Sequence, residues 1–162
     1  MIQNKYKTIF APDGGLLLDI KVFDVDARDW QRLFSFLPTK YVVTYSENGV
    51  GISQPALATI WERAKEAAVQ VEIMLVGFVV KAHFFQTQEI EMDLRPEDVD
   101  SEEKANAVFE LMSRTAIELG KEVFLIPEYA SATREQLKRM AICSADPVSG
   151  RITYYKGSPL SC

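Results

Sequence analysis

His83 is the only histidine in the chain, and histidine is the side chain whose proton exchanges most readily near neutral pH. It stands near the end of the longest apolar stretch, VEIMLVGFVVKAHFF, residues 71–85. One histidine and two distant cysteines, Cys143 and Cys162, do not supply a multi-histidine or CxxC zinc site. The sequence also lacks a G-x-S-x-G nucleophile elbow and a Walker A motif. His83 is therefore a weak catalytic candidate, and we expect no cofactor.

Grouped carboxylates are a second source of chemistry. Asp24, Asp26 and Asp29 lie within six residues of one another, and hard cations such as Mg²⁺ or Ca²⁺ bind clustered carboxylates. The cluster lacks the glycine and the distal glutamate of an EF-hand loop. Helix capping by Asp26 and Asp29 accounts for two of its members. These residues are thus weak metal-ligand candidates, and no metal centre is predicted.

Acidic residues are concentrated in one segment, residues 86–104. This segment has eight acidic and two basic residues, whereas the remainder has 15 acidic and 16 basic ones, so the segment accounts for the net charge of −5. A field of this sign repels nucleic acids and anionic membranes and attracts basic proteins. We therefore predict a basic protein partner and no binding to nucleic acid or membrane. The predicted partner-binding residues are Glu89, Glu91, Asp93, Glu97, Asp98, Glu102 and Glu103.

The composition indicates an ordinary globular protein. The 162 residues are 48% hydrophobic and 25% charged, which suits one domain over residues 1–162. The uninterrupted apolar run, residues 73–80, is far shorter than a membrane span. The first residues lack the pattern of a signal peptide, and the two cysteines do not suggest a planned disulfide. We expect a cytoplasmic protein.

Helices and strands alternate along the chain. Residues 6–10 and 15–25 are interpreted as an opening hairpin, and Asn48-Gly49 as the turn of a second one. Residues 71–85 are interpreted as one buried central strand, and the alternating residues 89–94 as a strand with one polar face.

Helices are predicted from capping signals and apolar spacing. One begins at the cap Asp26 and ends at Pro38, a second follows the cap Ser53, and a third runs from the cap Asp100 to Gly120. Residues 132–140 form a weaker helix and residues 141–155 a closing hairpin. Together these elements predict an α+β fold: one domain with a largely antiparallel sheet built from hairpins, and three to four helices packed mainly on one face.

Three functions remain open on this basis. The preferred hypothesis is a non-enzymatic acidic module that binds a basic protein. In size, acidity and small α+β layout alone, the chain looks like the small bacterial immunity proteins that block a toxin's active site, although it has no motif of such a family. The second hypothesis is a small hydrolase or transferase that uses dispersed carboxylates and His83. The third is a homodimeric structural or accessory protein.

Overall fold

A computed structural model describes residues 5–12, 14–128 and 133–155. Its elements follow the chain in the order α1 (Lys5–Ile9), β1 (Leu18–Phe23), α2 (Ala27–Lys40), β2 (Val42–Glu47), β3 (Val50–Ile52), α3 (Leu57–Ala64), β4 (Val69–Met74), β5 (Val79–Gln86), β6 (Glu89–Leu94), the 3₁₀ helix η1 (Pro96–Asp98), α4 (Glu102–Leu119), β7 (Val123–Pro127), α5 (Arg134–Arg139), β8 (Cys143–Ala145) and β9 (Ile152–Tyr154).

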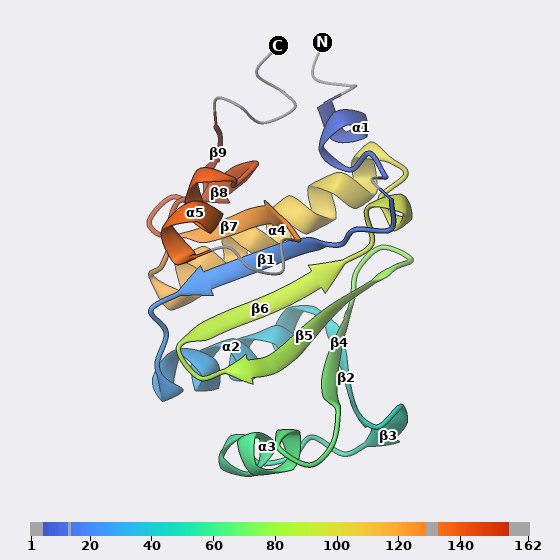
Figure 1. Cartoon of the computed structure of the whole chain (residues 1–162), viewed down its shortest axis with the longest axis vertical. Coiled ribbons are helices and arrows are strands. Elements are labelled where there is room, and N and C mark those ends of the chain that lie inside the picture. The colour runs from blue at the N-terminus through green and yellow to red at the C-terminus, as the bar shows by residue number, and fades with distance from the viewer. Residues whose placement is uncertain (1–4, 13, 129–132, 156–162) are drawn as a thin grey trace.

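All nine of these strands belong to one twisted sheet with the order β3-β2-β4-β5-β6-β1-β7-β8-β9 (Figure 1). Every neighbouring pair is antiparallel. Strand β1 is inserted between β6 and β7, so the chain's first strand lies in the middle of the sheet. The molecule is a single α+β domain, as predicted.

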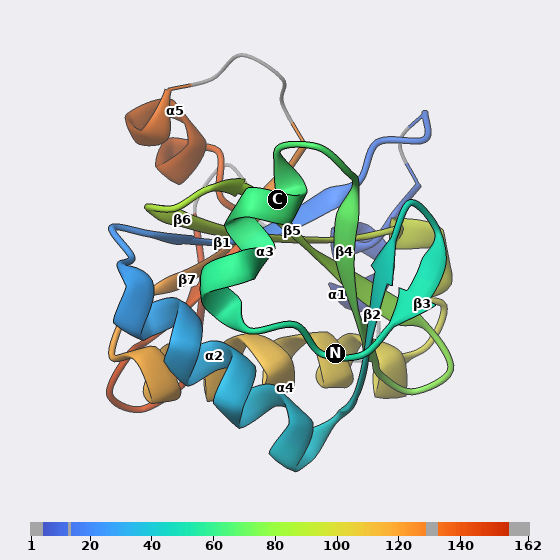
Figure 2. The same ribbon diagram turned by 90° about the horizontal axis from the view of Figure 1, so that it is seen from below.

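The two faces of the sheet are covered differently. Helices α2 and α4 lie side by side across one face, whereas α5 lies on the opposite side (Figure 2). Helix α3 packs against β4 and β5 and contacts α2 through Trp61, so it extends the covering of the same face as α2. The main core lies under α2, α3 and α4, because alternate strand residues such as Ile20, Met92 and Val71 point into it.

Aromatic side chains fill the core where α2, α3 and β5 meet. Trp30 is 1% exposed, and its ring forms a triangle with those of Phe34 and Phe84, whose centroids lie 5.8 and 5.4 Å from it. The edge of Trp61 meets the Trp30 ring at 4.9 Å. The indole N–H of Trp30 donates a hydrogen bond of 2.8 Å to the carbonyl oxygen of Thr87. This bond satisfies the one polar group of the buried ring and attaches α2 to the β5–β6 turn.

The stretch 71–85 is a hairpin, so the prediction of one central strand is wrong. Strand β4 ends at Met74, the chain reverses through Gly77 with φ +73°, and β5 begins at Val79. Val76 is 43% exposed because it lies in this turn, whereas continuous alternation predicted it to face the core. Gly77 divides the apolar run in two, because its positive φ lets the chain turn there.

Several local predictions were correct and several were not. The Asp26 capping box, the Asn48-Gly49 turn and the left-handed Gly120 cap are confirmed. Residues 6–9 belong to helix α1 and Phe10 to the turn after it, so this segment is not a hairpin strand; β1 takes its partners from β6 and β7. Pro38 lies inside α2, which continues to Lys40.

The caps of two other helices also differ from prediction. Ser101 caps α4 in place of Asp100, and its hydroxyl accepts a hydrogen bond of 3.2 Å from the N–H of Lys104. Helix α3 starts at Leu57, and its N-cap residue, Ala56, makes no side-chain capping bond. Among the described residues, no helix is both long enough and apolar enough to cross a membrane.

Candidate functional site

Ionisable side chains gather on the sheet face opposite α2 and α4. Strands β1 and β6 pair with Asp19 opposite Asp93 and Lys21 opposite Glu91, and β5 places His83 opposite Glu91. Because side chains alternate along each strand, these residues all project to the same side. We call this surface the polar face and define it by Asp19, Lys21, Lys81, His83, Glu89, Glu91 and Asp93.

Lys21 is the central cation of the polar face. Its Nζ lies 2.7 Å from Oε1 of Glu89 and 3.3 Å from Oε2 of Glu91. Burial favours the neutral amine, but the hydrogen bond to Glu89 and the surrounding carboxylates outweigh it and raise the pKa of Lys21. Lys21 therefore remains an ammonium ion committed to these two glutamates.

Asp19 is the least satisfied of these carboxylates. The residue is 6% exposed, and its side chain makes no hydrogen bond or ion pair with the other described residues. Burial and the negative charges of Glu91, Asp93 and Glu128 raise the pKa of Asp19 to about 7, against a smaller opposing effect of Lys21. A buried carboxyl group that titrates near neutral pH is a feature concentrated at functional sites.

A hollow of about 540 Å³ lies between the polar face and α5. Its acidic lining residues are Asp19, Asp24, Glu89, Glu91 and Glu128, and its basic ones are Lys21 and Arg134. Glu128 is held in place because its Oε2 accepts a 3.0 Å hydrogen bond from the N–H of Leu17. Phe23 and Leu137 supply apolar surface, so the hollow combines carboxylates with a hydrophobic wall.

His83 lies in a second hollow, of about 420 Å³, towards the other end of the polar face. Its Nε2 is hydrogen-bonded to Oδ2 of Asp93, and the Phe85 ring stacks on the imidazole at 5.0 Å. Lys81 and Asp98 also line this hollow. A carboxylate fixes the orientation of the imidazole ring, as it does for a general base. His83 therefore borders a hollow and has its ring oriented by Asp93, and the catalytic hypothesis needs both features.

The structure divides the predicted partner-binding residues between two surfaces. Glu89, Glu91 and Asp93 lie on the polar face, whereas Glu102 and Glu103 begin α4 and line a separate hollow with Val76. Glu97 and Asp98 lie between the two sets in η1, where Glu97 pairs with Arg95 at 2.9 Å. The acidic segment is continuous in sequence but not in space.

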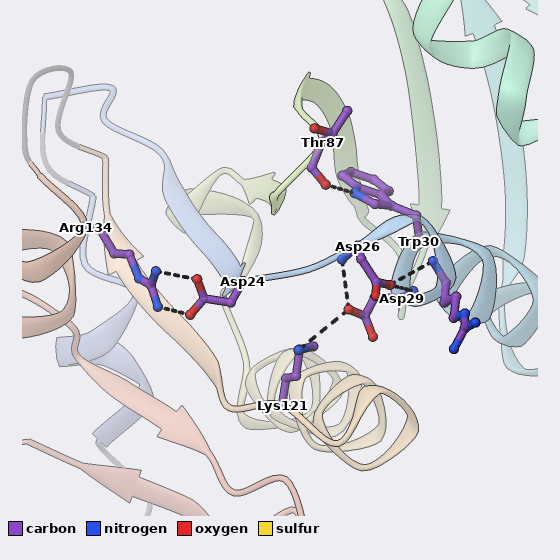
Figure 3. A network of polar contacts seen from close by, with 8 residues as sticks. Asp24, Asp26, Asp29, Trp30, Thr87, Lys121 and Arg134 are labelled. Carbon is purple, nitrogen blue, oxygen red and sulfur yellow. Dashed lines mark hydrogen bonds and ion pairs between the residues drawn. The ribbon is translucent and has the colours of Figure 1, made fainter.

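The carboxylates of Asp24, Asp26 and Asp29 point to different partners (Figure 3). Asp24 forms a two-pronged ion pair with Arg134, while Asp26 accepts hydrogen bonds of 2.9 and 3.0 Å from the backbone N–H groups of Arg28 and Asp29. Oδ2 of Asp29 accepts a 3.0 Å hydrogen bond from the N–H of Asp26 and lies 3.7 Å from Nζ of Lys121. Among the described residues, no group of three or more His, Cys, Asp or Glu side chains could hold a metal ion.

Sequence reasoning missed Asp19, Lys21 and Glu128. The signal for the first two was present in LDIKVF, residues 18–23, because two charged residues alternate there with residues predicted to face the core. All six residues of β1 are buried, so neighbouring side chains shield most of the surface of its two charged residues from water. Glu128 carried no such signal, because its place is set by the pairing of its backbone with Leu17.

The comparisons with known proteins yield no relative. No family model, no curated protein and no solved structure matches this chain. The arrangement of the polar face is therefore the basis for any statement about function.

Proposed function

We propose that this protein is a non-enzymatic binding module whose polar face engages a basic protein. The observation that carries the proposal is the hollow beside α5, which five acids line and in which the carboxylate of Asp19 forms no hydrogen bond or ion pair with a described residue. The cations at this hollow are already engaged, Lys21 with two glutamates and Arg134 with Asp24. An incoming cation would therefore meet Asp19 and Glu128, the two acids of the hollow that form no ion pair with a described residue.

Electrostatics supports a basic partner in preference to an acidic one. The acids of the polar face are half-buried, so water and salt screen them less than fully exposed charges. A partner that covers the face would strengthen its contacts with them by displacing water. A basic toxin or a similarly charged protein fits this surface, as the acidic composition predicts.

The two surfaces of the acidic segment allow a matched test. Immobilised wild-type protein is compared with Glu89→Gln/Glu91→Gln on the polar face and with Glu102→Gln/Glu103→Gln on α4, each pair removing the same charge. Proteins retained from a lysate of the source organism are identified, and a purified 1:1 complex is measured by calorimetry at two salt concentrations.

We expect the polar-face pair to weaken the complex by at least about tenfold and the α4 pair to change it by less than about threefold. Affinity should fall with salt. Circular dichroism checks that both variants fold. An affinity that does not depend on salt, or an equal loss in the α4 pair, would contradict the proposal.

A second candidate function is a hydrolase or transferase centred on His83. The hydrogen bond between His83 and Asp93 within an accessible hollow favours it, because an oriented imidazole can accept a proton from an attacking group. A screen of ester, amide and phosphate substrates with wild type and His83→Gln tests this function. Turnover that disappears in His83→Gln supports it, and the lack of turnover by wild type rejects it.

A further inference from the structure

Asp19 and its surroundings carry an inference about the chemistry of the bound group. The residue is nine-tenths buried at the sheet side of the 540 Å³ hollow, and no described residue donates a hydrogen bond to its carboxylate. The enclosed unpaired side-chain atoms of the described residues are the hydroxyl groups of Tyr41, Tyr45 and Thr115, whereas the carboxylate of Asp19 borders the hollow and can be reached from it. The nearest cation in sequence, Lys21, is directed towards Glu89 and Glu91 instead.

The hollow already shows how it accommodates a guanidinium group. At its rim, Arg134 forms a two-pronged ion pair with Asp24 while its guanidinium lies 5.5 Å from the centre of the Phe23 ring (Figure 3 shows the ion pair). Aromatic rings and carboxylates together are the environment that planar cations with N–H donors prefer. Asp19, Glu91 and Glu128 provide further acceptors in the same hollow without a guanidinium of their own.

We propose that the hollow between α5 and the polar face is a binding site for an alkylguanidinium or alkylammonium group, with the carboxylate of Asp19 as its principal acceptor. The apolar stem of the ligand would lie against Phe23 and Leu137, and its cationic end would reach Asp19. A metal ion is a poorer occupant, because the described residues contain no group suited to ligate one. The cation can come from an arginine or lysine of a partner protein or from a small molecule.

Binding by this site depends on pH through Asp19. The charged groups that face Asp19 are Lys21 on its own strand, Glu91 and Asp93 on β6, and Glu128 after β7. Glu89, Asp24 and Arg134 complete the charged lining of the hollow. With a pKa of about 7, the carboxyl of Asp19 changes from mostly protonated to mostly ionised as pH rises through neutrality. The site is therefore strongest above neutral pH.

The test is a titration of the full chain with n-butylguanidinium, followed by amide chemical shifts in NMR spectra. N-butylurea, which has nearly the same shape and no charge, is the ligand control. Asp19→Asn removes the proposed acceptor, and Asp100→Asn is the matched variant at an exposed position outside the hollow. Spectra of the unliganded variants establish that each is folded.

We expect saturable binding with shifts in β1 and β6, none with N-butylurea, and affinity reduced at least about tenfold in Asp19→Asn but unchanged in Asp100→Asn. The wild-type affinity should be about tenfold higher at pH 8 than at pH 6, since a carboxyl with a pKa of about 7 is about one-tenth ionised at the lower pH and nine-tenths at the higher. Absence of saturable binding, equal binding of N-butylurea, or an unchanged affinity in Asp19→Asn overturns the inference.

The peptide acetyl-Gly-Arg-Gly-amide identifies the source of the cation. Binding at least as tight as that of n-butylguanidinium assigns the site to a partner's side chain, and weaker binding assigns it to a small molecule. The inference rests on the proposed function, because the cation site lies on the polar face that is proposed to engage the partner. Failure of n-butylguanidinium to bind would overturn the inference alone, because the capture experiment measures the whole surface and does not require an occupied hollow.

Discussion

The ammonium group of Lys21 lies 2.7 Å from a carboxylate oxygen of Glu89, and the two residues are 68 positions apart in the chain. This ion pair joins β1 to β6, and two helices and four strands lie between these two strands in the sequence. It also holds Glu89 and Glu91 at the edge of the hollow that contains Asp19. The arrangement of the candidate site and the stability of the sheet are therefore coupled through one lysine.

Replacement of Lys21 tests that coupling. Lys21→Met keeps an unbranched side chain one atom shorter and removes the charge, leaving Glu89 and Glu91 half-buried without their partner. We expect a loss of about 2–4 kcal/mol in the free energy of unfolding, measured in urea. Lys65→Met removes a lysine from an exposed pair with Glu62 and should change stability by about 0.5 kcal/mol or less. Equal effects of the two substitutions would contradict the role given to Lys21.

Asp19 should make stability depend on pH. Its pKa is raised to about 7 in the folded protein from 3.8, so the folded state binds the proton more tightly than the unfolded state does. The contribution of Asp19 to the free energy of unfolding is therefore greatest below about pH 4 and decreases as pH rises from about 4 to 7. Above that range it stays constant, and the total change is about 4 kcal/mol.

Asp19→Asn isolates this contribution. Asp26, Asp100 and Asp146 have lowered pKa values from hydrogen bonds in the folded state, so they act in the opposite sense, and the comparison between wild type and variant cancels them. Unfolding in urea at a series of pH values should show that the variant gains stability relative to wild type as pH rises. A difference that is independent of pH would disprove the titration assigned to Asp19.

Trp30 should be the most sensitive position of the main core. Trp30→Phe retains an aromatic ring but removes the donor to the Thr87 carbonyl, and we expect it to cost about 1–3 kcal/mol. Trp30→Ala also opens a cavity among Phe34, Phe84 and Trp61, and should cost about 3–5 kcal/mol. Thermal unfolding measures both variants. A cost for Trp30→Ala no greater than that for Trp30→Phe would show that packing contributes little here.

Gly150 should tolerate no side chain. It has φ +71°, and an added Cβ would lie 2.9 Å from Cδ1 of Ile117 and 3.2 Å from Cβ of Ser113. Gly150→Ala should therefore destabilise the protein by about 2–3 kcal/mol, combining backbone strain with a clash against α4. Gly49→Ala, at φ +79° with open space around it, isolates the strain alone and should cost about 1 kcal/mol. The two variants are compared by their urea midpoints, and equal costs would exclude the clash.

Local sequence signals determined much of the fold and part of the candidate site. The alternation of residues 89–94 predicted a strand with Glu89, Glu91 and Asp93 on one side, and β6 has this arrangement. The Asp26 capping box and the Asn48-Gly49 turn depend on neighbouring residues alone, so they too were predictable. By contrast, the apolar run 71–85 was predicted to be one strand, and the positive φ of Gly77 makes it two strands and a turn.

The sequence by itself determined which residues of each strand share a face, because the period of two is a property of the extended backbone. Only the tertiary structure decided that β1 lies between β6 and β7, which brings Asp19 beside Asp93 and Glu128 beside Leu17. Pairing between strands so far apart in the chain depends on the packing of the whole core and leaves no local pattern. The burial of Asp19, and with it the candidate cation site, follows from that pairing.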